Sequence, residues 1–197
     1  IEVERPSLSQ FMGDWEANVP DIARVDEGPV DTGLRAIMFT DLEDSTVASS
    51  HHGDAHAMEL VKRHDMIVRE ALARFGGREV KHTGDGMLVS FTYISRAVEC
   101  AIAIQTAFAT VEVDGPGQRV RIGISAGEPV DHGDDLYGAV VNLAARICGH
   151  AEPGQTLVSA AVKELALGKQ LGFVDRGLIA LKGFPEPVRL YQAGVTG

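Results

Sequence analysis

A tight turn between two strand-like segments limits the folds that this chain can adopt. Gly84-Asp85-Gly86 separates residues 78–83 from residues 87–91, and both segments have the composition of β-strands. An aspartate between glycines at such a position is typical of a β-hairpin, so the two strands are expected to be antiparallel neighbours. A purely parallel, doubly wound sheet is therefore disfavoured.

The rest of the chain alternates predicted strands and helices around this hairpin. Apolar patterning predicts further strands at 34–39, 119–127, 156–158, 173–175 and 188–192. Helices are predicted at 56–75, 95–111 and 139–148. The order strand, helix, hairpin, helix, strand, helix predicts an α+β fold, a ferredoxin-like or palm-like sandwich with a mostly antiparallel sheet and helices on one face.

Residues 1–33 differ in character from residues 34–197. The first segment holds eight acidic residues against two arginines and is broken up by proline and glycine. Ser7 and Gln10 have capping-box spacing, and apolar residues at i, i+3, i+4 and i+7 predict a short amphipathic helix followed by a linker. The apolar stripe fits packing on its own domain and docking on a partner equally well. We expect one globular domain over 34–197.

The charge balance disfavours one class of partner. The chain has 18 Lys and Arg residues against 28 Asp and Glu residues, a formal net charge of −10. Nucleic-acid binding requires clustered basic side chains that displace counterions, so no nucleic-acid partner is expected. A small polyanion can still bind if divalent metals bridge it to carboxylates.

The cysteines and the hydropathy indicate where such a chain resides. Cys100 and Cys148 lie in apolar runs without CxxC spacing, which predicts two buried, reduced thiols and a cytoplasmic location. The sequence contains no apolar run long enough to span a membrane and no signal peptide. Because the chain begins at Ile1 rather than Met, we expect an upstream regulatory domain that is not included in it.

Two aspartates fall at positions that the predicted sheet would bring together. Asp41 closes the first predicted strand, and Asp85 occupies the tip of the hairpin. If that strand lies beside the hairpin, two carboxylates at one edge can hold two divalent cations, which can clamp an in-line phosphoryl displacement. Taken singly, each aspartate has an ordinary structural explanation that is favoured over a ligand role: Asp85 is typical of a β-turn, and Asp41 of a position before a helix.

The polar segment after Asp41 is a candidate for phosphate binding. It includes Leu42, Ser45 and Thr46 and leads toward the first predicted helix. Backbone N–H groups at the start of a helix can cradle a triphosphate, so these three residues are candidate substrate contacts.

A third polar cluster lies on the predicted helix at 139–148. Asn142 and Arg146 are four residues apart and therefore share one face of that helix. Their neighbours are small and apolar, so the arginine requires an anion or a solvated edge. Alone, the pattern fits a snorkelling arginine beside a surface asparagine.

Residues outside these clusters have simpler interpretations. His52 and His56 have the i, i+4 spacing of helical metal ligands, but no third ligand lies at a suitable spacing, which favours a solvent-exposed helix start. Arg119 and Arg121 alternate along a predicted strand, which favours a solvent-facing side. Alternation also predicts that His82 points away from its neighbours Lys81 and Asp85.

Three segments together resemble the class III adenylate and guanylate cyclases. They are residues 39–46, 79–86 and 135–146, in the family's order and with its spacings between charged residues. The resemblance spans roughly residues 34–192 and implies that 34–197 form a cyclase catalytic domain.

The resemblance implies a complete set of active-site residues. Asp41 and Asp85 match the two metal-binding aspartates of the family, which implies two Mg²⁺ or Mn²⁺ ions per site. Asn142 matches the residue that positions the ribose, and Arg146 matches the one that stabilises charge at the α-phosphate. Lys182 resembles a lysine that contacts the terminal phosphates.

Lys81 and Asp135 match the pair that selects the purine. Adenine offers an acceptor at N1 and a donor at its exocyclic amine, whereas lysine only donates and ionised aspartate only accepts. Guanine reverses both polarities, and an unmade buried hydrogen bond costs about 1–3 kcal/mol. The resemblance thus implies an adenylate cyclase that converts ATP to 3′,5′-cyclic AMP and pyrophosphate.

The family builds its sites at a dimer interface, so the resemblance implies a homodimer with two complete sites. An alternative is a catalytically silent cyclase-like module that binds nucleotide or dimerises to regulate an attached domain. That alternative is disfavoured because every active-site residue is present. A diguanylate cyclase requires a GG(D/E)EF hairpin, which Gly84-Asp85-Gly86 does not supply.

Overall fold

The computed structural model describes residues 33–43, 54–110 and 118–194, except for the side chains of 54–57. The amphipathic helix predicted within 1–33 lies outside the described residues. Ser45, Thr46 and His52, in a separate segment, lie outside them as well.

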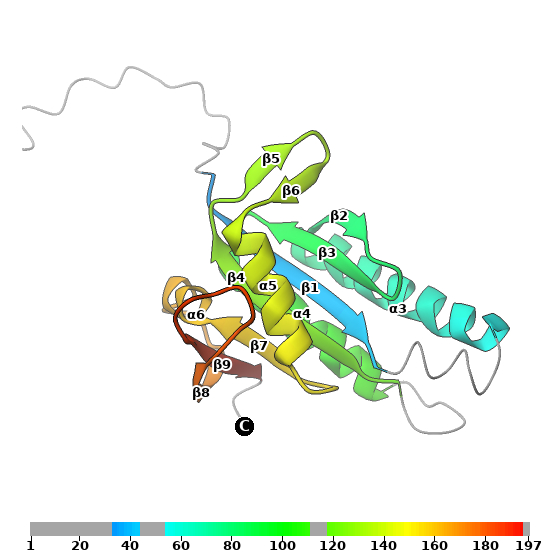
Figure 1. The fold of residues 1–197 in the computed structure, drawn as a ribbon. Coiled ribbons are helices and arrows are strands. Elements are labelled where there is room, and N and C mark those ends of the chain that lie inside the picture. The colour runs from blue at the N-terminus through cyan, green and yellow to red at the C-terminus, as the bar shows by residue number, and fades with distance from the viewer. Residues whose placement is uncertain (1–32, 44–53, 111–117, 195–197) are drawn as a thin grey trace, which may run out of the picture. The chain divides into compact units, whose positions relative to one another are not determined.

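A seven-stranded sheet forms the centre of the described domain (Figure 1). Its strands are β1 (Arg35–Leu42), β2 (Arg78–His82), β3 (Gly86–Phe91), β4 (Val120–Gly127), β7 (Thr156–Ser159), β8 (Gly172–Ile179) and β9 (Val188–Gly194). Their order across the sheet is β2-β3-β1-β4-β7-β9-β8, and neighbouring strands are antiparallel except for the parallel pair β4 and β7. The predicted α+β fold with a mostly antiparallel sheet is confirmed.

The first half of the sheet has the ferredoxin-like connectivity. Strand β1 leads into α3 (Asp54–Phe75), the β2–β3 hairpin follows, and α4 (Ile94–Thr110) returns the chain to β4 on the other side of β1. Helix α3 ends where Gly76 adopts a φ of 73°, and the N–H groups of Gly76 and Gly77 both donate to the Leu72 carbonyl oxygen.

Both faces of the sheet are covered, because β1 is apolar on both sides. Ala36 and Met38 belong to the main core, together with buried residues of α3 and α4. Ile37 points the other way and packs with Val141 and Ala144 of α5 (Ala139–His150). The two long helices therefore share one face as predicted, but the third predicted helix, α5, covers the opposite face, so the prediction of helices on one face only was wrong for α5 (Figure 1).

Helix α5 lies unusually close to the sheet. A Cβ atom on Gly123 of β4 would lie 2.1 Å from the backbone nitrogen of Cys148 and 2.6 Å from the carbonyl oxygen of Ala144. Only glycine allows this approach, which brings the backbone of α5 against that of β4.

Three short elements were not predicted. Strands β5 (Val130–His132) and β6 (Asp135–Tyr137) pair as a separate two-stranded hairpin, and α6 (Ala160–Leu165) follows β7. Three-residue strands are too short to produce a periodic signal in the sequence.

In the part of the chain that the structure describes, no helix is both long enough and apolar enough to pass through a membrane.

Candidate active site

The two predicted metal ligands lie side by side at one end of β1. Strands β1 and β3 pair antiparallel with Asp41 opposite Gly86, and the Leu42 N–H donates to the Asp85 carbonyl oxygen at 3.2 Å. A Cβ atom on Gly86 would lie 1.9 Å from the Thr40 carbonyl oxygen, so glycine is required where the turn meets β1. The hairpin thereby brings Asp85 next to Asp41, as the sequence predicts.

The electrostatics of Asp41 reflect this proximity. Partial burial raises the pKa of the Asp41 carboxyl above its ordinary value, Arg121 opposes that shift, and the neighbouring Asp85 carboxylate adds to it. The net shift is upward. The negative charge of Asp41 is therefore only partly compensated by Arg121, and a second carboxylate lies nearby, an arrangement that favours a bound cation.

Arg121 supplies that partial compensation. It lies directly across from Asp41 in the β1–β4 pairing, and its Nη2 donates to Asp41 Oδ2. Its Nε is buried and has no hydrogen-bond partner among the described residues. The prediction that Arg121 is merely solvent-facing was wrong, because the β1–β4 register brings its side chain to the acidic pair.

The predicted purine-selecting pair is also formed within one chain. Lys81 Nζ at the edge strand β2 lies 2.7 Å from Asp135 Oδ2 at the start of β6. Asp135 also accepts a hydrogen bond from the Leu136 N–H at 2.9 Å and one from the Tyr137 hydroxyl at 3.1 Å.

The mutual contact keeps both members of this pair charged. The hydrogen bond from Lys81 lowers the pKa of Asp135, and the same bond raises the pKa of Lys81. Both side chains therefore carry full charge at neutral pH. The pair presents one cationic donor and one anionic acceptor in the same place, and Lys81 is 56% exposed.

Asn142 and Arg146 lie on the exposed side of α5, while Val141, Ala144 and Ile147 of the same helix are buried. Because α5 covers the sheet face that carries Ile37, the two polar residues stand outside that face of the domain. The predicted shared helix face is thus present.

Lys182 lies in the exposed turn between β8 and β9. Its neighbour Leu181 is buried and clusters with Ile147 of α5, which ties this turn to the helix that carries Arg146.

Comparison with known protein families matches residues 31–193 to the adenylate and guanylate cyclase catalytic domain. The chain belongs to this family.

Relatives of this cyclase domain include proteins named as adenylate cyclases. The chain is 36% identical over 136 residues to "Putative adenylate cyclase 3" of Rhizobium meliloti (strain 1021), covering 67% of this chain and 23% of that protein. It is 34% identical over 167 residues to an adenylate cyclase of Podospora anserina, covering 70% of this chain and 8% of that protein. The cyclase domain thus spans less than a quarter of the length of either relative.

The fold also matches solved cyclase structures. One of them, of adenylate cyclases from Trypanosoma brucei in their monomeric state, superposes with a TM-score of 0.76 at 27% identity, covering 85% of this chain and 93% of that one.

The acidic pair of the cyclase domain fits the divalent ions that the family implies. Within the described ranges, no cluster of three or more His, Cys, Asp and Glu side chains is arranged to hold a metal. Mg²⁺ commonly binds through one or two carboxylates and takes its remaining oxygens from water and substrate phosphates. Two neighbouring carboxylates, Asp41 and Asp85, therefore fit the number and type of protein ligands that Mg²⁺ takes when substrate phosphates supply other oxygens.

The predicted phosphate contacts of the cyclase domain are only partly described. Ser45 and Thr46 lie outside the described residues. The Leu42 side chain is buried in the main core, and its backbone N–H donates to the Asp85 carbonyl oxygen. Leu42 therefore uses its only backbone donor to hold the turn that carries Asp85.

Proposed function

We propose that this cyclase domain is an adenylate cyclase that converts ATP to 3′,5′-cyclic AMP and pyrophosphate at sites shared between two copies of the chain. The Lys81–Asp135 pair carries the proposal for ATP, because a fixed donor beside a fixed acceptor is complementary to adenine N1 and its exocyclic amine. The names of the two curated relatives support the same substrate.

In the proposed reaction the ribose 3′ oxygen attacks the α-phosphorus of ATP. A bond from that oxygen to the α-phosphorus forms, the bond to the β-phosphate bridging oxygen breaks, and pyrophosphate leaves while the 3′-hydroxyl proton passes to water. When bound by Asp41 and Asp85, two Mg²⁺ or Mn²⁺ ions supply positive charge at the 3′ oxygen and at the phosphates.

The remaining side chains have separate tasks in this proposal. Asn142 orients the ribose, so that its 3′ oxygen is aligned with the α-phosphorus. Arg146 meets negative charge that grows in the transition state and should therefore act on turnover more than on substrate affinity. Lys182, with Ser45 and Thr46, contacts the terminal phosphates.

We further propose a homodimer, in which each site takes Asp41 and Asp85 from one copy and the base-reading and phosphate-binding residues from the other. The exposure of Lys81, Asn142 and Arg146 supports this division, because all three stand at the surface of a single copy. A symmetric dimer then contains two equivalent sites.

Incubation of the chain with ATP or GTP, each with Mg²⁺ or Mn²⁺, tests the proposed reaction. Cyclic AMP and pyrophosphate should form in equal amounts from ATP, and GTP should give much less cyclic product. Nucleotide binding without turnover under all four conditions would instead support a silent regulatory module. A preference for GTP would overturn the assignment of the substrate.

A cytoplasmic location and a regulatory domain elsewhere in the full protein are also part of the proposal. Cys100 and Cys148 are free and buried, and burial raises the pKa of both thiols to about 12, which is compatible with a reducing compartment. The much greater length of the two curated relatives supports additional domains.

A further inference from the structure

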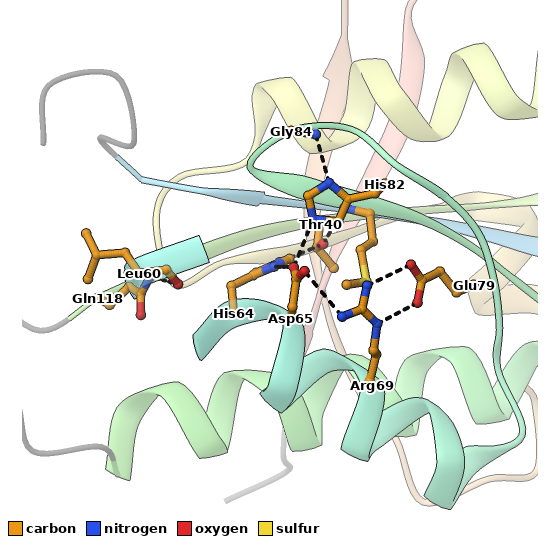
Figure 2. A network of polar contacts seen from close by, with 10 residues as sticks. Thr40, Leu60, His64, Asp65, Arg69, Glu79, His82, Gly84 and Gln118 are labelled. Carbon is orange, nitrogen blue, oxygen red and sulfur yellow. Dashed lines mark hydrogen bonds and ion pairs between the residues drawn. The ribbon is translucent and has the colours of Figure 1, made fainter. Parts of the chain in front are cut away.

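A chain of hydrogen bonds lies behind the acidic pair, between β1 and α3 (Figure 2). It begins at Thr40, the residue before Asp41, whose side chain points to the opposite face of the sheet and is 1% exposed. Thr40 Oγ1 accepts a hydrogen bond from the Met87 N–H at 3.0 Å and lies 2.9 Å from His64 Nε2. His64 is fully buried.

The chain continues through Asp65 to the hairpin. Asp65 Oδ1 lies 3.1 Å from His64 Nδ1 and 3.0 Å from His82 Nε2. The Gly84 N–H donates to His82 Nδ1 at 3.2 Å. His82 therefore points toward α3, whereas its neighbour Lys81 reaches Asp135 on the other side, as strand alternation predicts.

Only one arrangement of protons satisfies every member of this chain with neutral imidazoles. Because Gly84 donates to His82 Nδ1, the proton of His82 is on Nε2 and is donated to Asp65. Asp65 is ionised and accepts, so His64 donates from Nδ1 and accepts at Nε2 from the Thr40 hydroxyl. The same hydroxyl oxygen accepts the Met87 N–H.

The acidities of the members agree with this arrangement. Burial lowers the pKa of His64, which keeps the ring neutral near pH 7. Burial acts to raise the pKa of Asp65, but the hydrogen bonds from His64 and His82 outweigh it and the net pKa is lowered. A neutral ring and an ionised carboxylate are the forms that the hydrogen bonds require.

The two ends of the chain lie on either side of Asp85. Gly84 directly precedes that aspartate and Met87 follows it by two positions, while Thr40 directly precedes Asp41. The contacts thus fix the backbone around both acidic residues, although the imidazoles and Asp65 bond to neither acidic side chain in the contacts described above. Arg69 forms outer ion pairs with Asp65 and Glu79. The Arg69 side chain is half exposed, so these ion pairs contribute little to stability.

We propose that Thr40, His64, Asp65 and His82 are positioning residues that set the separation of the Asp41 and Asp85 carboxylates for metal binding. The inference rests on the proposed metal-dependent function of the acidic pair. Residues that hold metal ligands in place without touching the metal typically change metal affinity about 10- to 100-fold when they are replaced.

The Thr40 position offers a matched pair of substitutions and a control. Thr40→Val keeps the shape and removes the hydroxyl, whereas Thr40→Ser keeps the hydroxyl and removes the methyl group. Thr156→Val is the control, because Thr156 is also buried and lies on β7 of the same sheet. Its hydroxyl accepts a hydrogen bond from Gln105 Nε2 at 3.3 Å and lies outside the hydrogen-bond chain described above.

The measurement is Mn²⁺ affinity of the full chain with α,β-methylene-ATP, which cannot be cyclised, from the free Mn²⁺ signal in electron paramagnetic resonance. We expect Thr40→Val to weaken Mn²⁺ binding about 10-fold or more. The Mn²⁺ affinity of Thr40→Ser should stay within about threefold of that of the unchanged chain. Thr156→Val should bind Mn²⁺ as tightly as the unchanged chain, even if its melting temperature falls as far as that of Thr40→Val. Equal affinity in Thr40→Val and the unchanged chain would overturn the proposal.

His82 provides a second test at a partly exposed position that folding tolerates more readily. His82→Ala removes the acceptor of the Gly84 N–H, and His82→Asn retains an acceptor near the position of Nδ1. Weaker Mn²⁺ binding in His82→Ala with recovery in His82→Asn is the expected result. Equal loss in both variants would overturn the role of this hydrogen bond. If the unchanged chain neither binds Mn²⁺ nor forms cyclic nucleotide, the proposed function fails instead.

Discussion

Lys81 and Asp135 form an ion pair of 2.7 Å although they lie 54 positions apart in the chain. The contact joins the edge strand β2 to the short β5–β6 hairpin, so the proposed base-reading pair is already assembled within a single chain. In the proposed function this pair distinguishes adenine from guanine through the polarity of its two members.

The pair predicts a change of substrate when its polarity is altered. Lys81→Glu combined with Asp135→Cys should lower the ratio of kcat/KM for ATP to that for GTP at least 10-fold, because a donor toward adenine N1 is lost. Steady-state rates of cyclic AMP and cyclic GMP formation measure this ratio. Arg189→Gln removes an ion pair to Asp175 elsewhere on the surface and should leave the ratio unchanged. An unchanged ratio in the double variant would show that the two side chains do not read the base.

The contact between Arg121 and Asp41 predicts a shift in acidity. The guanidinium opposes the upward pKa shift of Asp41, so Arg121→Gln should raise that pKa further in the metal-free chain. Titration of ¹³C-labelled carboxyl groups by NMR measures the change. Arg119→Gln is the matched control, because Arg119 directly precedes the same strand and pairs with Glu43 instead. Equal shifts of the Asp41 pKa in both variants would contradict the assigned contact.

The buried His64 predicts how stability depends on pH. Its folded pKa lies below the ordinary value of 6.5, so the unfolded chain binds the proton more readily. The resulting stability is present above about pH 6.5 and is lost as the pH falls below that value. Three neighbouring groups also affect the pKa of His64: the Asp65 and Asp85 carboxylates raise it, and His82 lowers it. Because the pKa of Asp65 is also lowered, from 3.8, its contribution is lost at a lower pH.

Urea unfolding between pH 7.5 and 5.5 checks this dependence. The free energy of unfolding should fall across that range, and the fall should be smaller in His64→Gln, which does not titrate there. Parallel curves for the two proteins would assign the pH dependence to other groups.

The shared-site proposal predicts recovery of activity in mixed dimers. Asp85→Ala and Arg146→Ala chains should each be inactive, since every site in either homodimer lacks one required residue. Mixing them rebuilds one intact site per heterodimer, so up to about half of the activity per heterodimer should return. Gel filtration verifies that the variants still associate. Stable heterodimers without activity would exclude a site divided in this way.

The turn Gly84-Asp85-Gly86 allowed most of the fold to be predicted. A hairpin next to a buried strand requires antiparallel neighbours, and the strand, helix, hairpin, helix, strand order then leaves few topologies. The helix α5 was predicted on the wrong face, because periodicity shows that Val141 and Ala144 are buried but not which side of the sheet buries them.

The candidate site could be predicted only where chemistry and turn signals coincide. Asp41 and Asp85 end a strand and fill a turn, and both positions are visible in the sequence. Arg121 was missed because its importance depends on the β1–β4 register, which no local pattern encodes. His64 and Asp65 resemble ordinary helix residues until α3 is packed against Thr40.

The close approach at Gly123 has a consequence for motion. At Gly123 no side chain separates the backbone of α5 from that of β4, which restricts sliding and tilting of the helix on the sheet. Asn142 and Arg146 therefore travel with the sheet as one rigid body. In the proposed dimer, opening and closing around a nucleotide should then come from rocking of whole copies against each other or from the loops, and a spin label on α5 should keep a constant distance to one on β4 throughout turnover.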